Sequence, residues 1–133
     1  DITEKLEGKR ILLAEDNELN AEIAETVLEE TGIKVKHVED GIQCIEELKK
    51  MPEKYYDVIL MDVQMPNMDG YTATQRIRDL DDSRAEIPII AMTANAYDED
   101  RRKAQEAGMD GFLAKPLDVD EMMRLLGKIT KKE

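Results

Sequence analysis

The order in which apolar runs and helical patterns follow one another constrains the fold most. Short apolar runs occur at 10–14, 33–38, 57–61, 87–92 and 111–114, and residues with helical apolar spacing follow each run. The runs at 57–61 and 87–92 are apolar without alternation, which is typical of buried central strands in a parallel sheet. Five strand–helix units in strict alternation predict an α/β fold, a doubly wound five-stranded parallel sheet with right-handed crossovers.

Length and charge limit the organisation and the partners. A chain of 133 residues suits one domain, predicted at 9–129 with tails at 1–8 and 130–133. The formal net charge of −12 repels a phosphate backbone or an anionic membrane surface, so we expect no direct nucleic-acid or membrane partner. Cys44 is the one cysteine and lies in an apolar-periodic stretch, which indicates a buried thiol in a reducing, cytoplasmic setting.

Polar residues stand where four of the predicted strands end. Glu15 and Asp16 follow the first strand, Asp62 ends the third, Thr93 ends the fourth, and Lys115 follows the fifth. In an open parallel sheet, ligands bind beyond the carboxyl ends of the strands, so these side chains are predicted to share one crevice. Three carboxylates at one place repel each other unless a cation joins them, and Mg²⁺ prefers oxygen ligands.

The same set of residues suits a phosphoryl group. The ammonium of Lys115 and the hydroxyl of Thr93 are suited to binding phosphoryl oxygens. The carboxylate of Asp62 can attack phosphorus and form an acyl phosphate. Taken singly, each residue has a plainer interpretation: a helix cap for Glu15 and Asp16, and a turn or surface role for the others. Their joint placement favours a phosphoryl site.

Two features near the second strand receive a plain interpretation. Glu39-Asp40 is interpreted as a loop cap if that strand lies at the edge of the sheet, and His37 as a structural or surface residue. An internal phosphohistidine donor is therefore not expected.

Four segments carry a resemblance to a known family. "LLAEDN", "DVILMDVQMPNMDGY", "PIIAMTANA" and "DGFLAKP" together resemble the receiver domain of two-component response regulators, from Lys9 to Ile129. The Glu-Asp pair followed by "NELN" is most similar to receivers of hybrid histidine kinases, which act in a phosphorelay. The resemblance implies a flavodoxin-like fold with strand order 2-1-3-4-5.

The resemblance also implies roles for the site residues. Asp62 would be phosphorylated by the phosphohistidine of a histidine kinase or a histidine phosphotransfer domain. Asp16 and Asp62 would be direct Mg²⁺ ligands, Glu15 would act through water, and the main-chain carbonyl of Gln64 would be a further ligand. Thr93 and Lys115 would hold the phosphoryl oxygens, and Lys115-Pro116 would be a cis peptide.

A switch is implied as well. Phosphorylation would draw Thr93 toward the site and let Phe112 rotate inward. This change would reshape the surface of the helix at 97–108, the strand at 111–114 and the helix at 119–129, where an output domain or a second copy of the chain could bind. Phe112 lacks the hydroxyl of the family's commoner tyrosine.

The main alternative is an enzyme. Phosphatases of the haloacid dehalogenase type also use an aspartate nucleophile with Mg²⁺ at the end of a parallel strand. They resemble one another in a second aspartate two residues later, where this chain has Gln64. The resemblance therefore implies a signalling domain, which catalyses only its own phosphoryl transfer and dephosphorylation, and not a conventional enzyme.

Overall fold

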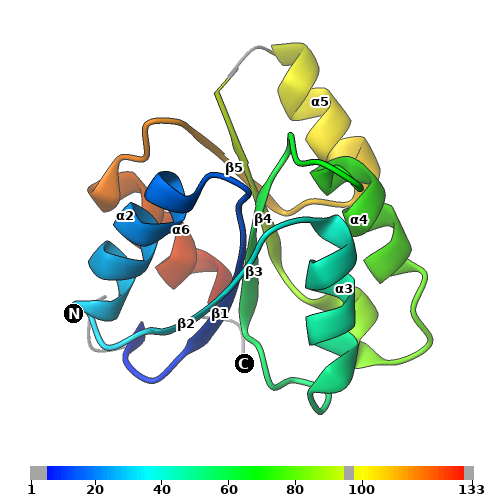
Figure 1. Cartoon of the computed structure of the whole chain (residues 1–133), viewed down its shortest axis with the longest axis horizontal. Helices are drawn as coiled ribbons and strands as arrows, with labels where there is room; N and C mark the ends of the chain where they lie inside the picture. The colour runs from blue at the N-terminus through cyan, green and yellow to red at the C-terminus, as the bar shows by residue number, and fades with distance from the viewer. Residues whose placement is uncertain (1–5, 95–97, 131–133) are drawn as a thin grey trace.

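The strands and helices alternate as the sequence predicts (Figure 1). The computed structural model describes residues 6–94 and 98–130. Asn95, Ala96 and Tyr97, which belong to one quoted motif and to the start of the fourth helical stretch, lie outside the described residues. In chain order the elements are β1 (Arg10–Ala14), α2 (Glu18–Glu29), β2 (Lys34–Val38), α3 (Gly41–Lys50), β3 (Val58–Asp62), α4 (Gly70–Arg78), a 3₁₀ turn η1 (Ser83–Glu86), β4 (Ile89–Thr93), α5 (Asp98–Ala107), β5 (Gly111–Ala114) and α6 (Val119–Thr130).

The sheet is parallel throughout, with strand order β2-β1-β3-β4-β5, which confirms the predicted topology. The pairing aligns the carboxyl ends of the strands: Ala14 lies opposite Met61, and Thr93 lies opposite Ala114. Residues that directly follow these positions therefore meet at one edge of the sheet.

The sheet separates two hydrophobic cores. Helices α2 and α6 cover one face, and α3, α4 and α5 cover the other (Figure 1). Alternate residues of β1 enter opposite cores: Ile11 and Leu13 pack under α2 and α6, whereas Leu12 and Ala14 pack under α3 and α4. All five residues of β3 and all five of β4 are buried, as expected of central strands.

Helix α2 buries a different face from the one that its large apolar residues suggest. Ala21, Ala24 and Leu28 are buried against the sheet. Leu19 and Ile23 share the helical spacing but are 64% and 56% exposed. Small residues allow the helix to lie close to the sheet, and two large apolar side chains are left facing solvent.

The folded unit extends slightly beyond the predicted boundaries. Leu6 is buried in the core beneath α2, and the N–H of Gly8 donates to the carbonyl of Gly32 at 2.9 Å, so part of the expected tail at 1–8 is packed. At the other end Thr130 belongs to α6. The rest of the expected tails, 1–5 and 131–133, lies outside the described residues. None of the helices in the described ranges is long and apolar enough to cross a membrane.

Candidate functional site

The predicted polar residues meet at the carboxyl edge of the sheet. Asp62 is the last residue of β3 and Thr93 the last of β4, while Glu15 and Lys115 directly follow β1 and β5. The N–H of Lys115 donates to the carbonyl of Thr93 at 2.7 Å, which continues the pairing of β4 with β5 past its last ladder residues. The peptide bond between Lys115 and Pro116 is cis, as the resemblance implies.

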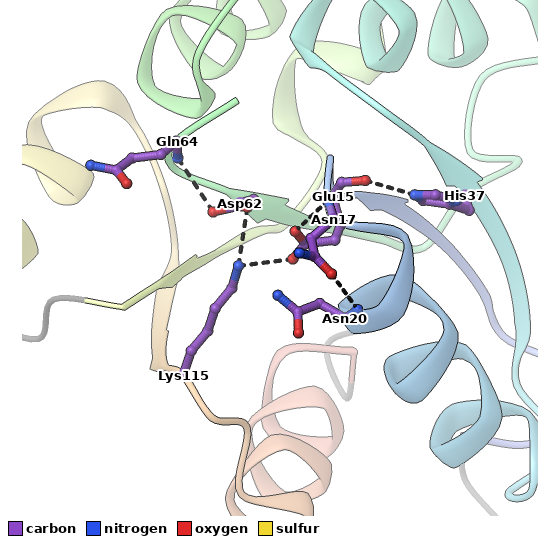
Figure 2. Close-up of polar contacts among 7 residues, drawn as sticks. All are labelled: Glu15, Asn17, Asn20, His37, Asp62, Gln64 and Lys115. Carbon is purple, nitrogen blue, oxygen red and sulfur yellow. Dashed lines mark hydrogen bonds and ion pairs between the residues drawn. The ribbon is translucent and has the colours of Figure 1, made fainter. Parts of the chain in front are cut away.

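The ammonium of Lys115 joins the two strands that carry buried acids (Figure 2). Its Nζ lies 2.9 Å from Oε1 of Glu15 and 3.0 Å from Oδ2 of Asp62. The side chains of Glu15 and Asp62 are 3% and 7% exposed, and that of Lys115 is 20% exposed. This lysine is therefore a partner of both carboxylates, and the interpretation of Lys115 as a solvated surface residue is wrong.

Glu15, Asp16 and Asp62 form a set of oxygens suited to a metal ion. One carboxylate oxygen from each lies within 4.8 Å of the others, and Asp16 is exposed while the other two are buried. Gln64 lies at the same place through its backbone, since its N–H donates to Oδ1 of Asp62 at 3.3 Å. Its side chain points away from Asp62 (Figure 2). An oxygen-rich site of this kind fits a hard divalent cation.

The surroundings in the site raise the pKa values of both Asp62 and Lys115, with opposite effects on their charge. Burial, and next the nearby charge of Glu15, raise the pKa of Asp62 from 3.8 to about 6, although Lys115 acts against them. Partial burial lowers the pKa of Lys115, but its hydrogen bonds to Glu15 and Asp62 outweigh burial and raise that pKa above 10.5. Lys115 therefore stays positively charged, whereas the surroundings of Asp62 disfavour the charged form of its carboxyl group.

Helix α2 is capped by a residue other than the acids. The side chain of Asn17 accepts the N–H of Asn20 at 2.9 Å, so Asn17 is the N-cap of α2. The N–H of Asn17 in turn donates to Oε2 of Glu15 at 3.0 Å. The simpler interpretation of Glu15 and Asp16 as helix caps is therefore wrong, and both stay available to the site.

Thr93 and Phe112 lie on neighbouring strands. Thr93 is buried at the end of β4. Phe112 lies on β5 opposite Ala91 and packs partly buried against the core under α3, α4 and α5. The ring also borders a groove between α5 and α6, where the guanidinium of Arg101 lies 4.8 Å from its centre.

Asp40 caps α3 at the sheet edge, which confirms its interpretation as a loop cap, but sequence reasoning missed the contacts of His37, Asp40 and Asn67 with the loops of the site. Nε2 of His37 lies 2.7 Å from the carbonyl oxygen of Glu15, which Figure 2 shows. Nδ2 of Asn67 donates to Oδ2 of Asp40 at 2.7 Å. The residues of each pair are more than twenty positions apart, so no local pattern joins them. The only signal in the sequence is an Asn in a turn and an Asp-Gly before a helix, which mark a turn and a cap.

The chain matches the response regulator receiver domain family over residues 11–127. It is 40% identical over 124 residues to the peroxide stress-activated histidine kinase mak1 of Schizosaccharomyces pombe, and the aligned part is 92% of this chain. It spans only 8% of the length of that kinase.

Solved structures agree with this match. The receiver domain of sensor histidine kinase PA1611 from Pseudomonas aeruginosa is 42% identical, with a TM-score of 0.83 over 94% of this chain and 99% of that one, and holds a magnesium ion coordinated in its active-site cleft. The receiver domain of the response regulator Ssk1 from Saccharomyces cerevisiae, solved together with the histidine phosphotransfer protein Ypd1, is 26% identical. Its TM-score is 0.85 over 95% of this chain and 91% of that one.

Three findings lead to one conclusion: the five parallel strands in the order 2-1-3-4-5, the acidic cluster bound by a lysine at their carboxyl ends, and the match over residues 11–127. The chain belongs to the response regulator receiver domain family.

Proposed function

We propose that this receiver domain accepts a phosphoryl group on Asp62 from a phosphohistidine, in a Mg²⁺-dependent phosphorelay. The observation that carries the proposal is the ion pair between Nζ of Lys115 and Oδ2 of Asp62, 3.0 Å long, within a cluster of three carboxylates. A nucleophile, a cation for the phosphoryl oxygens and a set of metal ligands thus lie within one small volume.

In the proposed reaction a carboxylate oxygen of Asp62 forms a bond to phosphorus while the bond from phosphorus to the histidine nitrogen breaks. The nitrogen leaves with the electron pair of that bond. Burial disfavours the charged carboxylate of Asp62, as its raised pKa shows, so conversion to the acyl phosphate moves charge outward onto the phosphoryl oxygens. Lys115, which reaches Asp62 already, is placed to follow that charge.

Mg²⁺ fits the site because it prefers oxygen ligands, and the oxygens of this site belong to carboxylates that repel one another unless a cation lies between them. We assign Asp16, Asp62 and the main-chain oxygen of Gln64 as direct ligands, with Glu15 acting through water. When bound, the ion supplies positive charge against the phosphoryl oxygens. The magnesium ion in the related PA1611 receiver supports this assignment.

We assign the switch to Thr93 and Phe112. Thr93, at the end of β4 beside Lys115, would bind a phosphoryl oxygen through its hydroxyl and move toward Asp62. Phe112, which borders the groove between α5 and α6, would turn inward and change the α5-β5-α6 surface. That surface is where we place an output domain or a second copy of the chain.

The partner that delivers the phosphoryl group would be a histidine kinase or a histidine phosphotransfer domain. The complex of Ypd1 with the Ssk1 receiver supports the second of these. We place the contact over the N-terminal half of α2, because Leu19 and Ile23 are exposed apolar residues on the helix that follows the acidic loop.

We further propose that the domain promotes its own phosphoryl transfer and hydrolysis. It would work in the cytoplasm, where the free, buried Cys44 stays reduced.

Acetyl phosphate tests the proposal without the partner. With Mg²⁺, intact-mass measurement should show one added phosphoryl group on the wild-type domain and none on Asp62→Asn. Asp69→Asn, at an exposed helix cap in the adjacent loop, is the matched control and should still gain the group. A wild-type domain that gains no mass in Mg²⁺, or an Asp62→Asn variant that gains it as fast, would overturn the assignment.

The phosphatase alternative of the haloacid dehalogenase type receives no support from these similarities. Gln64 offers the site its backbone and directs its side chain away from Asp62 (Figure 2). The second aspartate that such phosphatases carry two residues after the nucleophile has no counterpart at position 64.

A further inference from the structure

The corner between β2 and α3, residues 37–41, contacts both loops that carry the acidic groups. β2 is one of the two edge strands of the sheet, and none of the proposed ligands comes from it. The corner nevertheless bonds to Glu15 after β1 and to the 64–69 loop after β3. This arrangement needs an explanation, because a helix cap at this corner requires neither contact: the cap of α3 is the bond from the N–H of Gln43 to Asp40.

The first contact fixes the main chain of Glu15. Its N–H donates to the carbonyl of Val38 at 3.0 Å, and its own carbonyl oxygen lies 2.7 Å from Nε2 of His37. Because a carbonyl can only accept, Nε2 carries the hydrogen. Both backbone polar groups of Glu15 are thus bound to β2, so the direction in which the chain enters Asp16 is set from the edge of the sheet.

The second contact passes through the carboxylate of Asp40, which is 5% exposed. Its Oδ1 accepts the N–H of Gln43 at 2.8 Å and caps α3. Its Oδ2 accepts Nδ2 of Asn67 at 2.7 Å. Asn67 has a φ of 67°, a left-handed conformation that asparagine tolerates better than most residues. One buried carboxylate thus caps a helix and holds a strained turn 27 positions away.

The backbone reinforces this second contact at the next residue. The N–H of Gly41 donates to the carbonyl of Met68 at 3.1 Å. A Cβ at position 41 would lie 2.8 Å from that carbonyl oxygen, so only glycine permits the approach. The loop is therefore held at two consecutive residues, shortly after Gln64.

We propose that Asp40 is a positioning residue for the metal site, acting through Asn67 on the loop that carries the main-chain oxygen of Gln64. The inference rests on the proposed Mg²⁺ site. Mg²⁺ demands near-ideal octahedral geometry, so the placement of a backbone ligand matters more than for a flexible Ca²⁺ site. Side chains that orient ligands without touching the metal commonly change metal affinity by ten- to a hundredfold.

Asp40→Ser separates the two roles of this carboxylate. A serine hydroxyl still caps α3 but is too short to reach Asn67. Asp69→Ser is the matched control. Asp69 is exposed and caps α4 from the same loop, so its substitution removes one charge, as Asp40→Ser does, but breaks no bond between loops. A difference between these variants therefore reports the bond to Asn67 and not the lost charge.

Two measurements on the whole chain test the inference. Calorimetric titration with MgCl₂ should show a dissociation constant about tenfold weaker for Asp40→Ser than for Asp69→Ser. In the absence of Mg²⁺, amide hydrogen exchange should be faster in 64–69 and at Gly41 in Asp40→Ser alone, while the amides of α3 beyond Gly41 keep their protection. At saturating Mg²⁺ the rate of phosphorylation by acetyl phosphate should return to within about threefold of the wild type, because the ion itself then orders the loop.

A second variant shows whether Asp40 acts through Asn67. Asn67→Gly adopts the left-handed conformation without help from a partner, so adding Asp40→Ser to it should weaken Mg²⁺ binding by less than about twofold further. If the two effects multiply, or if Asp40→Ser matches Asp69→Ser in both affinity and exchange, the inference is overturned. If the wild-type domain itself binds no Mg²⁺, the proposed function fails first, and the exchange data still report whether Asp40 orders the loop.

Discussion

Replacing Asp62 with asparagine should stabilise the metal-free domain. Asparagine has nearly the same shape as aspartate and its amide oxygen can still accept from Lys115, but it carries no charge to bury. The rise of the Asp62 pKa from 3.8 to about 6 corresponds to about 3 kcal/mol at neutral pH, at about 1.4 kcal/mol for each pH unit. This value already includes the attraction between Lys115 and the charged carboxylate. Because the amide of asparagine fits the site less well than a protonated carboxyl group, we expect a net stabilisation of about 1–3 kcal/mol.

The effect has a pH dependence of definite sign. The folded domain keeps the proton on Asp62 up to about pH 6, whereas the unfolded chain releases it near pH 3.8. The folded state therefore binds more protons between these values, and the wild type loses stability as the pH rises from about 4 to above 6. Asp62→Asn escapes this loss, so its advantage should be small at pH 4.5 and complete at pH 7.5.

Thermal and urea unfolding in EDTA measure the difference. A gain of about 1–3 kcal/mol should raise the Tm at pH 7.5 by about 3–10 °C in a chain of this size. Asp81→Asn, at an exposed position, is the matched control and should change stability by less than about 0.5 kcal/mol. An Asp62→Asn variant no more stable than the wild type at pH 7.5, or an advantage equal at both pH values, would refute the reasoning. Adding MgCl₂ should stabilise the wild type more than the variant.

Two further substitutions and one labelling experiment have defined outcomes. Lys115→Ala leaves Glu15 and Asp62 buried without their cation, so urea unfolding at pH 7.5 in EDTA should show a loss of about 2–4 kcal/mol, and this loss should shrink at pH 5 as Asp62 becomes protonated. Arg78→Ala removes three donors to backbone carbonyls and one ion pair, so it should cost about 2–4 kcal/mol, and Arg78→Lys should recover little because an ammonium cannot span these acceptors. Burial, and next the charge of Asp40, raise the pKa of the Cys44 thiol to about 12, so iodoacetamide should label it at least about a hundredfold more slowly than in urea; fast labelling of the folded chain would contradict this.

Local patterns were enough to predict the central strands and the site at their ends. β3 and β4 are continuous apolar runs because both of their faces are covered, and this signal lies within five residues of sequence. Parallel pairing then brings the carboxyl ends of the strands to one edge, so the meeting of Asp62, Thr93 and Lys115 could be predicted without knowledge of distant contacts.

The features that could not be predicted depend on contacts between distant segments. The spacing of α2 permits two apolar faces, and only the closeness of the sheet decides that Ala21 and Ala24 are buried and that Leu19 and Ile23 are exposed. Leu6 stands in a polar segment that gives no periodic signal, yet it completes the core under that helix. Asp40 is readable from the sequence as a cap, but its second bond follows from how β2 docks beside β1.

The central sheet divides the buried residues into two cores that can accumulate substitutions separately. Leu19 and Ile23 lie on α2, whose buried residues belong to the same core as those of α6, whereas Phe112 packs against the core under α3, α4 and α5. The buried residues of one core are not those of the other, so a substitution within one core acts directly on the packing of that layer alone. The proposed donor contact on α2 can therefore diverge without a change in the packing around Phe112, whereas α6 belongs both to the core under α2 and to the proposed α5-β5-α6 surface and so connects the two.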